Sequence, residues 1–507
     1  MSPRSIALLI LVSFPLLAAG QSAGQAPGPS VEERLRRLEQ RQEETDQQIR
    51  EKDARIRELE RQLQTAGQPA AAAPAPGVPV VVSPAAVAAT PAPSPAPAEA
   101  PAAAPAKPDK WGAFEPGKGF VLARTDLGEL DFSVYTYVRY INQKGLDPTF
   151  TDSFGRTKDL DLRSDVQLQK VTLTFKGWLL DPKLRYRFYA WTANTNQGQK
   201  AQVVLAGNLN YDFNEYFTLG GGIDALPTTR TTNGTFPNWL KVDHRTIADE
   251  FFRGSYTSGI WATGKVAEGL RYRVMAGNNL SQLGVSAAQL TGSFNTLSGA
   301  LWWMPTTGEF GPGEGFGDFE YHKEVATLFG VHFTRSREDK QSQPGTETIE
   351  NTQIRLSDGT AIFDLDAFGP GTQITRATYE MAAANAGIKY RGYSLDAEYY
   401  WRWVDDFSIR GPVPVDSLYD HGFQLQASAM LVPQSIQAYV AGSRISGEYG
   451  NPSDVSIGFN WYPYRNRALR LNAQLLYLNE SPVGYSAVPM ALGGDGPVWT
   501  SDVVFNF

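Results

Sequence analysis

Apolar and polar residues alternate with a period of two in many short segments after Trp111, which is typical of β-strands. In the segment 170–191, two such arms flank a turn at 178–182, and each arm has one apolar and one polar face. A soluble sandwich would bury the apolar face in a core, whereas a transmembrane barrel presents it to lipid and keeps the polar face for a water-filled lumen. Because this unit recurs through the rest of the chain, we interpret it as a barrel.

The alternation predicts an all-β transmembrane barrel of sixteen antiparallel strands, and eighteen strands are the alternative. The predicted strands are 129–141, 166–177, 183–192, 201–211, 215–223, 256–265, 269–278, 297–304, 323–335, 376–391, 394–404, 421–431, 435–445, 453–462, 467–479 and 498–507. Short and long connections alternate, as short periplasmic turns and long outer loops do. Two connections do not fit: 305–322 is long and glycine-rich where a short turn is expected, and 193–200 is short where a long loop is expected.

The first 110 residues have a different composition and predict three segments ahead of the barrel at 111–507. Residues 1–22 resemble a secretory signal peptide, with Arg4 before an apolar run that ends in small residues. Residues 31–65 predict an α-helical coiled coil, and 66–110 are a Pro/Ala-rich stretch that cannot bury a core and favours an extended periplasmic linker. We therefore expect an outer-membrane protein with an N-terminal stalk in the periplasm.

The coiled-coil prediction rests on apolar positions that recur every three or four residues over about five heptads. The segments 34–39 and 55–60 both resemble the Arg-h-x-x-h-Glu motif (h, apolar) of short trimeric coils, so we expect a homotrimer. A single solvated helix is the alternative. The last strand ends in Phe507, which resembles the C-terminal signal read by the outer-membrane barrel assembly machinery. Outer-membrane lipid and peptidoglycan are the other partners that we consider.

Composition argues against several classes of function. The chain has no cysteine, four histidines and a net charge of −7, which disfavours a cysteine or zinc enzyme and gives no basic field for nucleic acid. The histidines, at 244, 322, 332 and 421, form no recognisable spacing with a serine and an acid. We therefore expect no enzyme, no catalytic residue, no metal and no cofactor.

Three segments are similar to strands of the phosphate-selective porin O and P family: 169–177, 184–187 and 387–399. The resemblance covers most of 119–507. It implies a trimer of sixteen-stranded barrels in which the third outer loop folds inward, and it implies phosphate-type anions as solutes. The coil and linker are closer in plan to those of the sucrose porin.

In the predicted threading, the third outer loop is 224–255, and we expect it to fold into the lumen and form the narrowest point. It carries charges of both signs, which would create a transverse field that polar solutes tolerate better than apolar ones. These constriction-loop residues are Arg230, Lys241, Asp243, Arg245, Asp249, Glu250 and Arg253. The alternative is an outer lid that never enters the pore.

The predicted strand register turns mostly basic residues inward, and it leaves the acids mainly in loops. A group of these basic residues lies close to short turns and forms a lumen basic belt near the periplasmic mouth. The members of this belt are Lys170, Lys176, Arg185, Arg187, Arg271, Arg273, Lys389 and Arg391. We therefore expect a passive diffusion channel for small hydrophilic solutes with a weak preference for anions. A general or sugar porin that also tethers the outer membrane to the cell wall is the alternative, and a one-residue register slip would invert the inward assignment.

Overall fold

The computed structural model describes residues 112–115, 119–193, 202–283, 285, 289, 294–343 and 353–507. The chain divides into two compact units, Met1–Ala102 and Ala103–Phe507, and all described residues belong to the second. The predicted signal peptide, coiled coil and linker lie outside the described residues. None of the helices within the described ranges has both the length and the apolar character that a membrane-crossing helix requires.

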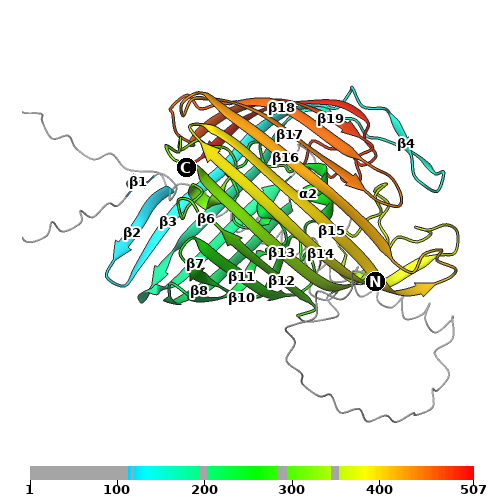
Figure 1. Ribbon diagram of the computed structural model, residues 1–507, viewed down its shortest axis with the longest axis horizontal. Coiled ribbons are helices and arrows are strands. Elements are labelled where there is room, and N and C mark those ends of the chain that lie inside the picture. The colour runs from blue at the N-terminus through cyan, green and yellow to red at the C-terminus, as the bar shows by residue number, and fades with distance from the viewer. Residues whose placement is uncertain are drawn as a thin grey trace, which may run out of the picture. The chain divides into compact units, whose positions relative to one another are not determined.

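Sixteen antiparallel strands form a closed barrel, as the sequence predicted (Figure 1). Each strand pairs with the next along the chain, and the last strand, β20, pairs with the first, β3, to close the ring. The strands are β3 (Gly128–Asn142), β6 (Ser164–Leu179), β7 (Asp181–Ala193), β8 (Gln202–Asn214), β9 (Phe217–Ala225), β10 (Tyr256–Ala267), β11 (Leu270–Gly277), β12 (Thr296–Trp303), β13 (Ala326–Asp339), β14 (Gln373–Tyr390), β15 (Tyr393–Arg410), β16 (Leu418–Val432), β17 (Ile436–Ser446), β18 (Ser453–Trp461), β19 (Leu469–Asn479) and β20 (Gly496–Asn506).

Two further strands extend the sheet without widening the ring. They are β1 (Phe114–Glu115) and β2 (Gly119–Thr125), and β2 pairs with the beginning of β3. On the same edge, β20 pairs with the end of β3, so β2 continues the line of β20 and adds nothing to the circumference. The terminal Phe507 lies at this junction, where its ring contacts Phe120 with 5.9 Å between centroids. The sheet thus has eighteen strands and the barrel wall sixteen.

The strands present apolar side chains outward and polar side chains inward. In β13, Phe329, Val331 and Phe333 are about half exposed on the outer surface, whereas His332 and Thr334, which alternate with them, are buried in the interior. The same order continues through the other strands of the wall. This arrangement is the one that a barrel needs when lipid surrounds it and polar groups fill the lumen.

Long connections gather at one end of the barrel, and several pack together there. One carries the hairpin of β4 (Thr149–Thr151) and β5 (Thr157–Asp159), and β4 projects beyond the strands in Figure 1. Apolar residues of the loops at 353–372 and 480–495 join one cluster with Phe251 and Phe252 of helix α2 (Ile247–Phe252). The helix itself lies within the ring of strands, so this core is inside the barrel rather than beside it.

The connection between β12 and β13, residues 304–325, lies at the end where the other connections are short turns, and it also enters the barrel. Phe310 is fully buried, and its carbonyl accepts a hydrogen bond of 2.6 Å from Lys389 Nζ of β14. Phe316 and Phe319 are buried as well. The alternation rule therefore fails here because this segment is a second insertion that fills interior space. The other irregular connection, 193–200, lies almost entirely outside the described residues.

Candidate functional site

The long segment between β9 and β10, residues 226–255, lies inside the barrel and is attached to one side of the wall. Three of its backbone carbonyls accept hydrogen bonds from wall side chains. Arg470 of β19 donates to Trp239 O (2.7 Å), Asn460 of β18 to Leu240 O (3.0 Å), and Arg139 of β3 to Val242 O (2.5 Å). We call this segment the inward loop.

Helix α2 fixes the second half of the inward loop against the neighbouring strands. The helix begins after Thr246, whose side chain accepts from Asp249 N and so caps the first turn. Thr246 Oγ1 donates to Gln424 of β16 (3.0 Å), and Ala248 N donates to Ser443 of β17 (3.1 Å). The polar faces of these strands are thus occupied by the loop, which leaves the open lumen on the opposite side.

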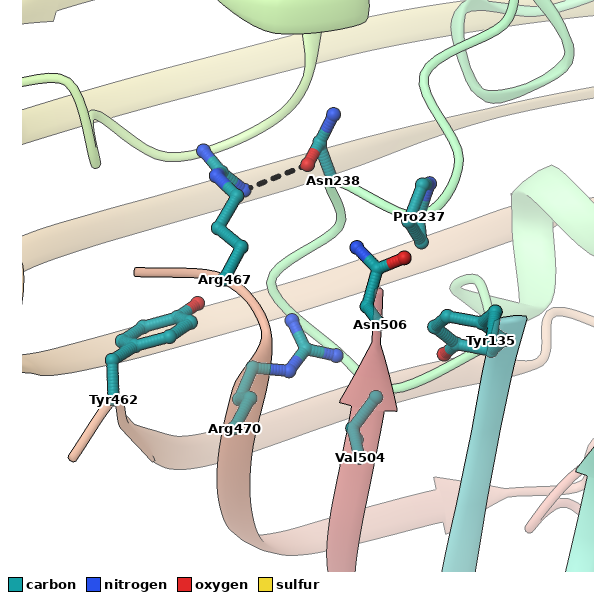
Figure 2. Close-up of a pocket in the computed structure, with 8 residues that line it drawn as sticks. All are labelled: Tyr135, Pro237, Asn238, Tyr462, Arg467, Arg470, Val504 and Asn506. Atoms are coloured by element: carbon teal, nitrogen blue, oxygen red, sulfur yellow. Dashed lines mark hydrogen bonds between the residues drawn. The ribbon is translucent and has the colours of Figure 1, made fainter. Parts of the chain in front are cut away.

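Figure 2 shows where the tip of the inward loop meets the short-turn end of the wall. Arg467, between β18 and β19, points toward Asn238 and donates from Nη1 to its Oδ1 over 2.9 Å. The Nη2 of Arg467 pairs with Glu320 of the 304–325 connection at 2.9 Å. Phe316 of the same connection donates its backbone N–H to Asn238 O (2.8 Å). The two inward segments therefore support each other.

A cavity of about 300 Å³ remains between the inward loop and the wall from β6 to β12. We call it the passage. Its charged lining comprises five basic and two acidic side chains: Lys170, Arg187, Arg245, Arg253 and Arg273, with Asp224 and Asp243. Its lining also includes seven aromatic side chains: Tyr189, Trp191, Phe236, Trp239, Tyr256, Trp302 and Tyr485. The passage is thus both positively charged and rich in rings.

The structure places the seven predicted constriction-loop residues in two groups. Asp243, Arg245 and Arg253 line the passage. The other four, Arg230, Lys241, Asp249 and Glu250, are buried between the loop and its surroundings and do not line it. The opposed charges of the loop are therefore used mostly to hold the loop in place.

The buried loop charges are matched by named partners. Arg230 pairs with Asp396 of β15 at 2.8 Å, and Glu250 receives both Arg253 (2.7 Å) and Arg245 (3.1 Å). Asp249 accepts hydrogen bonds from Thr229 (2.8 Å) and Thr231 (2.6 Å), which are neutral donors. Burial raises the pKa of Asp249 above its ordinary value, although Arg245 opposes this shift.

Two further loop residues are buried without an anion at hydrogen-bond distance. Lys241 Nζ lies 4.0 Å from Asp454 Oδ2 of β18, so the pair is an ion pair but not a hydrogen bond. Burial lowers the pKa of Lys241. Burial also lowers the pKa of His244 well below its ordinary value, and the nearby charges of Lys241 and Arg139 act in the same direction. His244 is therefore neutral in the folded protein.

The predicted basic belt is not one continuous band. Lys170, Arg187 and Arg273 line the passage. Three others share the inward face of their strands but lie elsewhere: Lys176 pairs in register with Asp131 and Arg187, Arg185 forms an ion pair with Asp212 (2.8 Å), and Arg271 forms one with Glu314 (3.4 Å). Burial raises the pKa of Glu314, whose carboxyl belongs to the 304–325 connection.

The last two belt residues do not line the passage. Lys389 is buried beneath the 304–325 connection, where it contacts Phe310. Arg391 is exposed and has a positive φ of 48° in the turn between β14 and β15, so the wall ends before it. The prediction extended the strand alternation one step into a turn, and for Arg391 it was wrong.

Most acids of the described barrel lie outside its strands, as the sequence predicted, but several further carboxylates face inward from strands and neutralise basic residues there. Arg139 pairs with Asp502 at 2.6 Å, and Arg402 pairs with Asp420 at 2.6 Å. Asp454 faces Lys241 from β18. The signal was present in the sequence, because each of these acids is in phase with the polar positions of its strand.

The aromatic lining was missed for a different reason. Trp302 and Trp303 are adjacent in sequence, a pattern that also suits an outer aromatic girdle. Trp302 lines the passage, whereas Trp303 is half exposed on the outer surface. Adjacent residues of a strand face opposite sides, so only one member of such a pair can belong to the outer girdle.

One group of acidic and histidine side chains within the described ranges has metal-ligand spacing: Asp318, Glu320 and His322, with ligand atoms within 4.8 Å of one another. These side chains have other partners. His322 contacts Asp318 (2.5 Å) and Glu309 (3.0 Å), and Glu320 pairs with Arg467. We interpret these three side chains as structural, because their hydrogen bonds and ion pairs hold the 304–325 connection in place.

Comparison with known proteins matches this chain to many solved structures. No family model and no curated protein matches the chain. Matching solved structures include OmpT of Vibrio cholerae in its trimer form (10% identity, TM-score 0.44, 75% of this chain and 100% of that one), the anion-selective porin from Comamonas acidovorans (10%, 0.44, 75% and 100%) and the outer-membrane channel DcaP of Acinetobacter baumannii (11%, 0.43, 76% and 99%). Identities and TM-scores this low carry no functional argument.

Proposed function

We propose that this protein is an outer-membrane porin, a passive diffusion channel for small hydrophilic solutes with a weak preference for anions. The observation that carries the proposal is the passage itself. It lies inside a closed barrel with an apolar outer surface. Its five basic side chains outnumber the two acids of the lining together with Asp249 and Glu250, which lie behind the lining next to Arg245 and Arg253. A permeating ion responds mainly to charges within the screening length, about 8 to 10 Å at physiological salt. The local excess of positive charge therefore outweighs the net charge of −7 of the whole chain.

The inward loop is the constriction in this proposal. It occupies the side of the lumen bounded by β15 to β20 and leaves the passage on the other side. The resemblance of three segments to the phosphate-selective porin O and P family suggests phosphate-type anions as solutes.

A bilayer experiment tests both parts of the proposal. Purified protein in a planar bilayer should form open channels, and reversal potentials in a salt gradient should indicate anion preference. Absence of any conductance would contradict the porin proposal. Conductance with cation preference would contradict only the proposed selectivity.

We also propose a homotrimer that the barrel assembly machinery inserts through the strand ending at Phe507, with an N-terminal stalk in the periplasm. Phe507 already pairs with β3, because its backbone N–H donates to Val134 O over 2.9 Å. Mass measurement in mild detergent should give a trimer for the full-length protein. A trimer of 111–507 alone would make the coil an accessory, and monomers in both cases would contradict the assembly.

A general or sugar porin that tethers the outer membrane to the cell wall is the second candidate. The seven aromatic side chains of the passage favour it, because ring faces also contact sugars. Equal permeation of neutral sugars and anions of the same size would support this candidate. Co-sedimentation with peptidoglycan that is lost on deletion of 31–110 would support the tether.

A further inference from the structure

Trp302 and Arg273 are lumen-facing residues on neighbouring strands, and together they form a two-part surface in the passage. In the register of β11 and β12, Arg273 lies opposite Ala300, so Trp302 is its diagonal neighbour on the same face. Such diagonal pairs lie within reach of aromatic and long side chains. Both residues line the passage. A ring and a cation are thus presented side by side to a permeating solute.

The indole of Trp302 is supported on one side and available on the other. It packs against the buried cluster that contains Met304 and Phe310 of the 304–325 connection. Within the described ranges, no other aromatic ring and no cation is stacked on it. Most rings of the passage differ in this respect, since Lys170 lies over Trp191 (4.6 Å) and Arg245 over Trp239 (4.5 Å). Trp302 therefore has a face that a planar solute can contact.

The guanidinium of Arg273 is held in position and stays accessible from the passage. Its Nη2 pairs with Asp224 of β9 at 2.8 Å, and its Cζ lies 5.1 Å from the ring centre of Trp261. About a fifth of the side chain is exposed, and the residue lines the passage. A carboxylate on a solute can therefore form a charge-assisted hydrogen bond with it.

A second cation of the passage is also available. Arg187 of β7 is exposed to the lumen, and its Cζ lies 5.7 Å from the ring centre of Tyr189. It forms no ion pair with any residue that the structure describes. The passage therefore holds more positive charge than its own acids neutralise.

From these observations we infer that the passage binds, during permeation, an organic anion in which a planar ring carries a carboxylate, with the ring on Trp302 and the carboxylate at Arg273. This inference rests on the proposed porin function and names the solute class of the same passage. Inorganic phosphate would use the cations but not the ring, and a neutral sugar would use the ring but not the positive charge of Arg273. A benzoate-like anion uses both.

The test measures how added solutes reduce the single-channel chloride current of the full-length protein. The probes are benzoate, acetate, inorganic phosphate and glucose, each titrated at constant ionic strength and pH. Benzoate should halve the current at a concentration roughly threefold to tenfold lower than acetate, which is the factor expected from one ring contact. Glucose should also require a higher concentration than benzoate to halve the current.

Two adjacent tryptophans provide matched variants. Trp302→Ala should abolish the advantage of benzoate over acetate and leave the effect of phosphate unchanged. Trp303→Ala removes the same side chain from the outer face of the same strand and should leave all four titrations unchanged. Arg273→Gln should weaken the inhibition of the chloride current by benzoate and by acetate to a similar extent, because both solutes carry a carboxylate.

The outcomes separate the two proposals. If chloride conductance is absent, the porin function fails. If chloride conducts but benzoate and acetate act equally, or if Trp303→Ala acts like Trp302→Ala, the porin function stands and the inference on solute class is overturned. Stronger inhibition by phosphate than by benzoate would also overturn it.

Discussion

Arg139 of β3 donates from Nε to Asp502 of β20 over 2.6 Å, and this buried pair joins the first and last strands of the barrel. The same guanidinium donates from Nη2 to Val242 O of the inward loop. One side chain therefore stabilises both the closure of the ring and the position of the inward loop. The two contacts couple the closure of the wall to the placement of this loop.

Removing this side chain should affect stability and conductance together. Arg139→Ala leaves the buried carboxylate of Asp502 without its partner, which costs about 3–5 kcal/mol. We expect a lower urea midpoint for the barrel in lipid vesicles and a larger or noisier single-channel current. Arg335→Ala is the control, because Arg335 pairs with Glu380 at an exposed site and should change the free energy of unfolding by about 0–1 kcal/mol. Equal effects of the two substitutions would contradict this account.

Deletion of residues 230–245 should raise the single-channel conductance. These residues fill the half of the lumen opposite the passage, so their removal widens the narrowest cross-section. Shortening the exposed hairpin at 149–159 removes a comparable length of chain from outside the barrel and should leave conductance unchanged. Unchanged conductance of the variant that lacks residues 230–245 would mean that the inward loop does not form the narrowest point of the lumen.

The 304–325 connection should act as a second narrowing at the short-turn end. Replacing 309–319 with a short turn removes the contacts of Phe310 with Lys389 and of Phe316 with Asn238. We expect a further rise in conductance, and an inward loop that is more easily cleaved by protease because its lower support is gone. Wild-type conductance and wild-type protease resistance would show that the connection neither narrows the lumen nor supports the inward loop.

Arg187 should contribute more to anion preference than Arg185. Both belong to β7, but Arg185 is neutralised by Asp212 at 2.8 Å, whereas Arg187 has no ion pair among the described residues. Arg187→Ala should shift the reversal potential in a salt gradient toward cation permeability, and Arg185→Ala should shift it less. Lys183→Ala, at the exposed beginning of the same strand, is the matched control. Anion preference that survives loss of both arginines would place the selectivity elsewhere.

His244 should make the protein less stable in mild acid. Burial and the charges of Lys241 and Arg139 hold its pKa below the ordinary value of about 6.5, so the unfolded chain binds its proton more readily than the folded one. The stability contributed by neutral His244 is complete above that value and declines as the pH falls below it. Between pH 7 and pH 5, the unfolding midpoint of the wild type should therefore fall further than that of His244→Gln. An identical pH dependence of the two proteins would exclude this role.

The order of residues along the chain by itself determined the barrel. Alternation with a period of two assigns each side chain of a strand to one face, and it is a local property that needs no knowledge of distant partners. It therefore predicted the sixteen wall strands, a last strand that ends near Phe507, and an unusually long segment between β9 and β10. The same rule failed at Arg391, where the strand ended one residue earlier than the pattern did.

Only the tertiary structure decided how the interior is used. Asp502 lies 363 residues from Arg139, and no local pattern indicates that the two neutralise each other or that Arg139 also binds the inward loop. The 304–325 connection was recognised as irregular, but its entry into the barrel depends on the space left by the inward loop. The diagonal placement of Trp302 beside Arg273 depends on the register between β11 and β12. These features arise from contacts between residues that are far apart in the chain, so they depend on the closed ring and not on any one strand.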